Sequence, residues 1–139
     1  MTSASNLLVL DTSVLISAAL FPGSVPDQAV IFAFEHFEVA TSDAMLAELK
    51  ASLAKPKHQQ YASVAQRLRF YEIFQANTRA ITVTEAVTAC RDPKDDMVLE
   101  LALSAGSRII VSGDKDLLTM SPFRGIEIVS PRQFVTEFQ

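Results

Sequence analysis

The sequence predicts a single α/β domain with a parallel sheet, because short apolar runs rich in β-branched residues alternate with longer segments of helical periodicity. The first run, residues 7–10, is four consecutive apolar residues, which is typical of a strand buried on both faces. The chain has 139 residues, enough for one domain with a full hydrophobic core. We therefore expect one domain over residues 1–139, with right-handed crossovers between its strands.

Four further segments resemble this first strand in length and composition. Residues 37–41, 108–112 and 126–130 are short, β-branched and bounded by turn or capping residues. Residues 80–84 have the same character more weakly. The four segments complete the expected sheet.

The intervening segments have the period of helices. A helix is expected from Pro26 to about His36, and a second from an N-cap at Ser42 to about Leu53. A longer helix follows the break at Pro56, with a stripe that we expect to pack in the core. The stripe consists of Tyr61, Val64, Leu68, Tyr71 and Phe74.

Two more helices are expected in the C-terminal third. One contains Val98, Leu99, Ala102 and Ala105 and ends at Gly106, which is a suitable C-cap. A short terminal helix begins at Pro131. An apolar segment also follows Asp11, directly after the first strand.

The bulk composition limits the class of protein. The net charge is −4 and the pI about 5.1, whereas a protein that holds nucleic acid by charge should be basic. Metal ions or a local cationic rim would have to offset this acidity if RNA or DNA were the substrate. The lone Cys90 excludes disulfides within the chain, and no positive charge precedes the first apolar segment. We expect a soluble cytoplasmic protein without a membrane span, with His36 and His58 at the surface.

Several carboxylates are expected at one edge of the sheet. Asp11 follows the first strand, and Asp114 and Asp116 follow the strand at 108–112. Ligands bind outside the carboxyl ends of the strands in parallel α/β sheets, so both loops should face the same site. A role as a turn or cap residue is the alternative for each single aspartate.

Two helices could bring further acids to this edge. Asp92, Asp95 and Asp96 precede a helix, where aspartate is also favoured as a cap, but three acids exceed what one cap needs. Glu48 lies at the border of the apolar stripe of its helix, and a solvated position is an equal alternative. Four carboxylates in one pocket would repel one another or bind a cation.

A cluster made of oxygen ligands alone suits Mg²⁺ or Mn²⁺ better than zinc. Such an ion assists the attack of water on a phosphoryl group. Metal-assisted phosphodiester hydrolysis is therefore the chemistry that the acids favour, with phosphomonoester hydrolysis next.

The order of these motifs resembles that of the PIN-domain family, and most closely its VapC-like toxins of toxin–antitoxin systems. The four motifs, in chain order, are residues 10–15, Glu48, residues 92–96 and residues 112–118. The resemblance covers nearly the whole chain. It implies a three-layer α/β/α fold with about five parallel strands. It also implies a Mg²⁺- or Mn²⁺-dependent endoribonuclease, an antitoxin partner and a homodimer.

The same resemblance implies roles for individual residues. The catalytic acids would be Asp11, Glu48, Asp95 and Asp114, with Asp116 as a candidate fifth. We hypothesise that Asp11, Asp95 and Asp114 bind the metal directly, and that Glu48 is either a further ligand or the residue that positions the attacking water. Supporting positions would be Thr12, Ser13, Asp92 and Ser112. Ser13 departs from the asparagine that is common in the family. The cations Arg91, Lys94 and Lys115 could contact RNA or could be solvated surface charges.

Two alternatives belong to other classes. A haloacid-dehalogenase-like phosphatase needs a second aspartate two residues after the first, where this chain has Ser13. A non-catalytic binding module would use aromatic side chains of the helices, such as Phe34 and Tyr71, to capture a partner protein.

Overall fold

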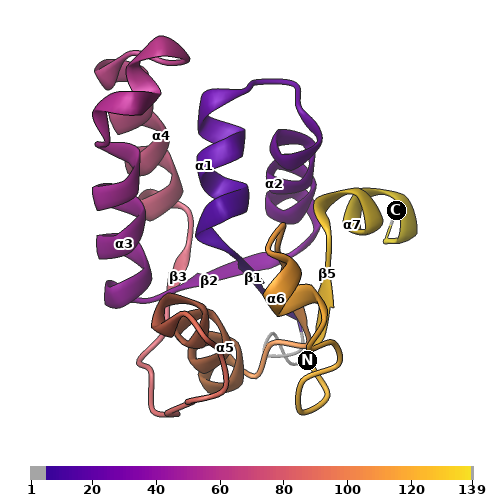
Figure 1. Ribbon diagram of the computed structural model, residues 1–139. Helices are drawn as coiled ribbons and strands as arrows, with labels where there is room; N and C mark the ends of the chain where they lie inside the picture. The colour runs from indigo at the N-terminus through magenta and orange to yellow at the C-terminus, as the bar shows by residue number, and fades with distance from the viewer. Residues whose placement is uncertain (1–5, 139) are drawn as a thin grey trace.

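Five parallel strands form the centre of the fold, in the order β3-β2-β1-β4-β5. The structure is a computed structural model that describes residues 6–138 (Figure 1). The expectation about a secretory signal concerns residues 1–5, which lie outside the described part. The strands are β1 (Leu7–Leu10), β2 (Glu38–Thr41), β3 (Arg79–Ala80), β4 (Ile109–Val111) and β5 (Glu127–Val129).

Helices cover both faces of this sheet, so the predicted three-layer α/β/α fold is confirmed. The helices are α1 (Thr12–Leu20), α2 (Val25–His36), α3 (Asp43–Leu53), α4 (Val64–Ala76), α5 (Pro93–Ala105), α6 (Lys115–Leu118) and α7 (Pro131–Glu137), with a 3₁₀ turn η2 (Pro56–Gln60). No single helix within residues 6–138 is long and apolar enough to cross a membrane, and the bent pair α1 and α2 passes that test by length and composition only.

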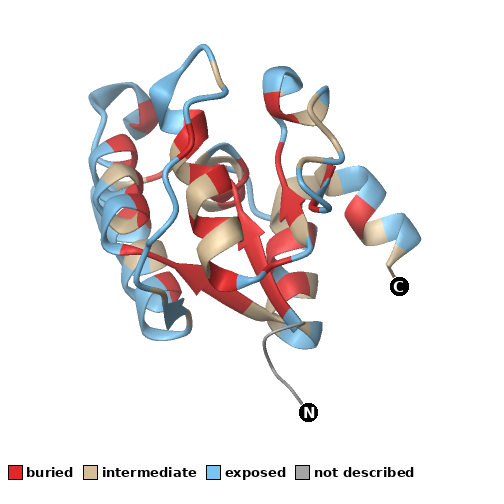
Figure 2. Ribbon diagram, turned by 90° about the horizontal axis from the view of Figure 1, so that it is seen from below, coloured by how far each residue is buried: buried red, intermediate tan, exposed pale blue. Residues whose placement is uncertain are grey.

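The two faces of β1 pack into two separate cores. Leu8 and Leu10 contact the layer of α1, α2, α3, α4 and α7, whereas Leu7 and Val9 contact the layer of α5 and α6. All four side chains are buried, and in Figure 2 the central strands are red between helices whose outer sides are pale blue. The prediction of a strand buried on both faces is confirmed.

Capping residues begin and end several helices, among them Ser42 and Gly106, which were predicted, and Ser130, which was not. Ser42 and Ser130 each accept a hydrogen bond from a backbone N–H in the first turn of α3 and α7. Gly106 ends α5 in the left-handed conformation, with φ of 68°. The helix α1, which follows the first strand directly, is an addition to the expected elements.

The prediction that the apolar stripe on the fourth helix packs in the core is wrong for most of its residues. Tyr61, Val64 and Leu68 are 53%, 64% and 47% exposed, and only Phe74 of the stripe is fully buried. The buried residues of α4 are instead Arg67, in its first half, and Phe74. α4 packs on α3 and α1 at the edge of the layer, so only a narrow side of it faces inward.

Two smaller predictions also differ from the structure. The weak strand expected at 80–84 is the two-residue, exposed strand Arg79–Ala80 at the edge of the sheet. His58, expected at the surface, is 8% exposed inside the turn between α3 and α4, whereas His36 is exposed as predicted.

Candidate metal centre

The carboxyl ends of β1 and β4 define the site. β2 lies on one side of β1 and β4 on the other, so the order of strand addition reverses at β1. This is the topological switch point at which open α/β sheets bind ligands. The Asp11 N–H donates to the Val111 carbonyl at 2.9 Å, which holds the two strand ends together.

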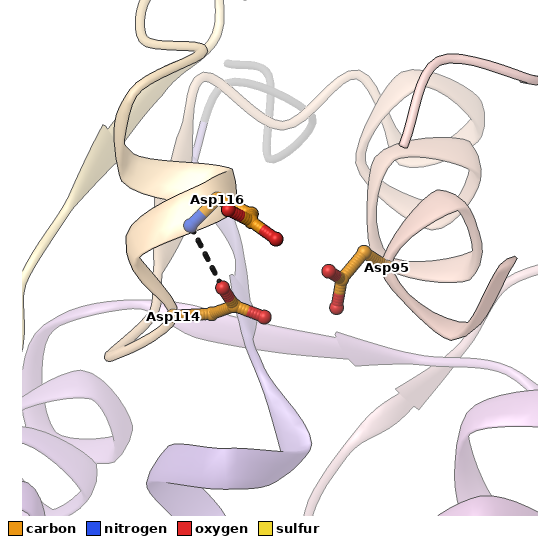
Figure 3. Close-up of side chains that lie close together, drawn as sticks. All are labelled: Asp95, Asp114 and Asp116. Atoms are coloured by element: carbon orange, nitrogen blue, oxygen red, sulfur yellow. Dashed lines mark hydrogen bonds between the residues drawn. The ribbon is translucent and has the colours of Figure 1, made fainter. Parts of the chain in front are cut away.

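Three aspartates converge beside this point. Asp95, Asp114 and Asp116 each offer a carboxylate oxygen, and these oxygens all lie within 4.8 Å of one another. Asp95 comes from the first turn of α5, and the other two come from the start of α6 (Figure 3). Asp114 is the N-cap of α6 and accepts a hydrogen bond from the Asp116 N–H at 2.8 Å, which fixes the spacing of the pair.

Asp11 lies next to these three and is 4% exposed. Its Oδ2 accepts hydrogen bonds from Ser112 Oγ at 2.7 Å and Ser13 Oγ at 3.1 Å, and its Oδ1 accepts a long one from Thr12 at 3.5 Å. Burial raises the pKa of Asp11, as does the charge of Asp114, while the bonds from the two serines oppose the rise. Asp11 is outside the group within 4.8 Å, but it shares its electrostatic environment.

Asp95 is the acid most affected by its neighbours. Burial first, and then the charge and hydrogen bond of Asp114, raise its pKa from 3.8 to about 7. The charges of Asp11 and Asp92 add to this rise. Burial and the neighbouring negative charges both disfavour the ionised form of Asp95, and a bound cation would oppose both effects.

The three aspartates around the start of α5 have three different roles. Asp92 is the N-cap and accepts from the Lys94 N–H at 3.0 Å. Asp96 turns the other way and accepts from the Ala89 and Cys90 N–H groups at 3.0 and 2.9 Å, and the first of these bonds is the largest cause that lowers its pKa. Only Asp95 faces the cluster, as expected.

Glu48 approaches the site from α3. Its side chain is 21% exposed and accepts a hydrogen bond from Ser52 Oγ at 2.8 Å. Its Oε2 lies 3.6 Å from Lys94 Nζ, so the carboxylate points to the start of α5. Glu48 therefore borders the cluster and is not one of the three acids within 4.8 Å.

Two of the three candidate RNA-contacting cations pair with acids of the site. Arg91 Nη2 lies 2.9 Å from Asp116 Oδ1, and Lys94 pairs with Glu48. Both cations are largely exposed, at 86% and 61% of their side chains, so these pairs add little stability. Lys115 is exposed on α6, so it could contact RNA or could be a solvated surface charge.

Thr41 is a residue at this edge that the sequence analysis did not single out. It ends β2, is 3% exposed, and its Oγ1 has no hydrogen-bond partner among the described residues. Thr41 follows the pattern of Asp11, a polar residue at the end of a strand, and this pattern could have identified it from the sequence.

The donor set fits a hard divalent cation. Carboxylate oxygens are the ligands that Mg²⁺ and Mn²⁺ prefer, and no cysteine or histidine belongs to the group. The crowded acids, with the raised pKa values of Asp11 and Asp95, gain from an added positive charge.

Known proteins resemble this chain in sequence and in fold. An uncharacterised protein of Methanocaldococcus jannaschii, MJ1680, is 28% identical, over 95% of this chain and 91% of the relative. The fold is similar to that of VapBC2 from Rickettsia felis bound to a DNA fragment from their promoter, with a TM-score of 0.62, 12% identity, and coverage of 89% of this chain and 98% of that one. It is also similar to PAE2754 from Pyrobaculum aerophilum, with a TM-score of 0.62, 15% identity, and coverage of 96% and 89%.

The family model of the PIN domain matches residues 7–116, which contain the first four strands and all the acids of the site. The order of the motifs, the five-stranded parallel sheet and this match agree. The chain belongs to the PIN domain family.

Proposed function

We propose that this protein is a Mg²⁺- or Mn²⁺-dependent endoribonuclease that hydrolyses phosphodiester bonds of RNA. The observation that carries the proposal is the group of Asp95, Asp114 and Asp116 within 4.8 Å at the switch point of the sheet. Capping of α6 and the pair with Arg91 account for single acids of the group, but like charges at such distances repel one another, and a bound cation would relieve this repulsion. Membership of the PIN domain family supports this reading over a phosphatase.

The proposed roles follow the geometry. Asp95, Asp114 and Asp11 would hold the metal, with Asp116 as a further ligand. The metal supplies a Lewis acid for the phosphoryl oxygen and lowers the pKa of an attacking water. Glu48, at the border of the cluster, would orient that water by a hydrogen bond.

The supporting side chains fix the acids before substrate arrives. Ser112 and Ser13 hold Asp11 by hydrogen bonds to the same oxygen, so its other oxygen keeps a defined direction. The shorter reach of Ser13, compared with asparagine, still allows this contact at 3.1 Å. Pre-positioned ligands of this kind reduce the reorganisation that binding requires.

The test is cleavage of a labelled single-stranded RNA with Mn²⁺ or Mg²⁺, with EDTA as one control. Asp11→Asn and Asp114→Asn should reduce the rate by a factor of 100 or more, because each removes a ligand of the reacting site. The matched control is Asp43→Asn, an exposed aspartate in the first turn of α3 that lies outside the cluster. Cleavage that survives EDTA and both site variants would contradict the proposal.

We further infer that the chain is the toxin of a toxin–antitoxin pair. The fold similarity to VapBC2 supports this reading, and the inference also predicts a protein that inhibits the nuclease. Expression of the wild-type chain alone should stop growth of a bacterial host, and expression of Asp114→Asn should not. Equal growth of both strains at equal protein levels would contradict the toxin role.

An apolar groove away from the metal centre supports the proposal that a partner protein binds this chain. It has a volume of about 920 Å³ and lies between α2, the start of β2 and α4. Its apolar lining includes Ile31, Phe34, Phe70 and Ile73, of which the two isoleucines are half exposed. This groove is on the edge of the sheet opposite to the metal centre. It is also the feature that a non-catalytic binding module would use, and absence of any Mn²⁺ binding in calorimetry would favour that alternative.

A further inference from the structure

The free end of the α3–α4 hairpin has a charge opposite to that of the rest of the chain. Residues 49–71 contain five of the twelve Lys and Arg residues and none of the sixteen acids. We call residues 50–69 the hairpin tip. Lys50, Lys55, Lys57 and Arg69 of this tip are exposed. The acidic pI of the whole protein therefore hides a local cationic surface.

Apolar and aromatic side chains are exposed on the tip and directly beside it. Phe21, at the end of α1, contacts Tyr61 edge to face with ring centroids 4.9 Å apart. The two rings are 43% and 53% exposed, and Val64 and Leu68 continue the surface along α4. The Lys50 ammonium lies 5.7 Å from the centre of the Tyr71 ring and lines the same shallow pocket as Val64 and Leu68.

A buried arginine links the parts of the tip to one another. Arg67 is 3% exposed and donates hydrogen bonds to the carbonyls of Leu53 (2.6 Å) and Ala62 (3.1 Å). It also donates to Gln59 Oε1 at 2.8 Å. These bonds tie the end of α3, the turn η2 and the start of α4 to one another. Each donor goes to a neutral oxygen, so the positive charge of the tip is not cancelled inside it.

The tip and the metal centre are joined by two helices. α1 begins just after Asp11 and ends beside Phe21, and α3 carries Glu48 and then leads to the tip (Figure 1). Nine helical residues at 1.5 Å each give α1 a length of about 14 Å. A single strand of a few nucleotides can extend over this distance.

We propose that the hairpin tip binds single-stranded RNA and holds the strand whose phosphodiester enters the metal centre, an inference that rests on the proposed nuclease function. Lysines contact the phosphates, and the Tyr61 and Phe21 rings provide faces on which bases stack. The acids of the metal centre repel a polyanion in the absence of metal, so affinity for a long strand has to come from another surface. The tip, together with the adjoining Phe21, combines the cations and the aromatic rings that this requires.

The test uses a fluorescent twelve-nucleotide oligouridine and the full chain, in EDTA, at several salt concentrations. Lys55→Ala/Lys57→Ala should bind about tenfold more weakly, and the slope of log K against log salt should fall by about 1.4, since each phosphate contact to a single strand contributes about 0.7. Tyr61→Ala should also weaken binding about tenfold, without a change in slope. The control is Arg108→Ala/Arg132→Ala, which removes two exposed cations outside the tip. Thermal melts confirm that each variant is folded.

The outcomes separate this inference from the proposed function. Binding of the tip variants with the affinity and salt slope of the control overturns the inference, even if the wild type cleaves RNA. Binding that depends on the tip, with no cleavage in Mn²⁺, supports the inference and contradicts the nuclease. Equal, tip-dependent binding of poly-glutamate would assign the tip to an acidic protein and overturn it. Hydrolysis of bis(4-nitrophenyl) phosphate in Mn²⁺ should be unchanged in the tip variants, because this small diester cannot reach the tip.

Discussion

Ser112 Oγ donates a hydrogen bond of 2.7 Å to Asp11 Oδ2, and this bond connects two strand ends that are 101 residues apart in the chain. Both residues are buried, at 0% and 4% exposure. The serine also accepts the Asp114 N–H at 3.0 Å, so one hydroxyl positions an acid on each side of it. The relationship explains how β1 and β4 together build the site.

Ser112→Ala should therefore damage the site more than the fold. We expect the loss of two buried hydrogen bonds to cost about 1–3 kcal/mol in the free energy of unfolding. The Asp11 pKa should rise further, because a bond that opposes the rise is removed. RNA cleavage should fall by a factor of about 10 or more, measured at saturating Mn²⁺.

Ser107→Ala is the matched control for this prediction. Ser107 is equally buried, and its hydroxyl bonds the Ile109 backbone at the opposite end of β4. It should lose a similar free energy of unfolding and keep the cleavage rate of the wild type. A proportional loss of activity in both variants would mean that Ser112 acts through stability alone.

The neighbours Asp95 and Asp96 should behave in opposite ways when each is changed to asparagine. Asp95→Asn removes a proposed metal ligand and relieves repulsion, so cleavage should be lost while the metal-free protein becomes more stable. Asp96→Asn weakens two bonds to backbone N–H groups, so it should lower the free energy of unfolding by about 1–2 kcal/mol and leave much of the activity. Cleavage assays and urea unfolding measure the two effects. Equal losses of activity would show that both acids serve the reaction.

The raised pKa of Asp95 predicts how the stability of the metal-free protein depends on pH. The native carboxyl holds its proton up to about pH 7, whereas the ordinary value of 3.8 applies to the unfolded chain. Between these values the native state binds more protons, so the contribution of Asp95 to stability falls as the pH rises. Asp95→Asn should therefore gain about 2–3 kcal/mol relative to wild type between pH 5 and pH 8, in EDTA. A difference between the two proteins that is constant over this range would contradict the assignment.

Mn²⁺ affinity should have the opposite trend with pH. Binding requires the deprotonated acid, so the affinity should increase about tenfold for each pH unit below about 7 and level off above it. Titration calorimetry at pH 6, 7 and 8 measures this change. Asp96→Asn serves as the control, because the pKa of Asp96 is low and its proton is absent over the whole range.

The sequence was sufficient for the parts of the fold that local patterns determine. The buried strand at 7–10, the N-cap at Ser42 and the C-cap at Gly106 each depend on a few neighbouring residues, and all three are confirmed. The convergence of Asp11 with Asp114 also followed from sequence, because the strand-end rule relates two loops without any knowledge of side-chain directions.

The orientation of α4 could not be predicted in this way. Its sequence offers an apolar stripe through Tyr61, Val64 and Leu68, and hydrophobic spacing favours that stripe as core. The structure buries Arg67 instead, since the carbonyls at the end of α3 need donors and the guanidinium supplies several. Hydrophobic spacing contains no information about acceptors elsewhere in the chain that need a donor. Periodicity therefore predicts the apolar stripe as the buried side of α4, although it is exposed.

Arg67 therefore offers a direct test of what orients the hairpin tip. Arg67→Ala leaves buried carbonyls of Leu53 and Ala62 without their donor, so the free energy of unfolding should fall by about 3 kcal/mol or more. Arg67→Lys supplies one donor group in place of a planar fork and should recover only part of this loss. Arg69→Ala, an exposed arginine two residues away, should change stability by less than about 0.5 kcal/mol. The midpoint of urea unfolding measures all three, and a small effect of Arg67→Ala would mean that the apolar contacts of α4 alone set its orientation.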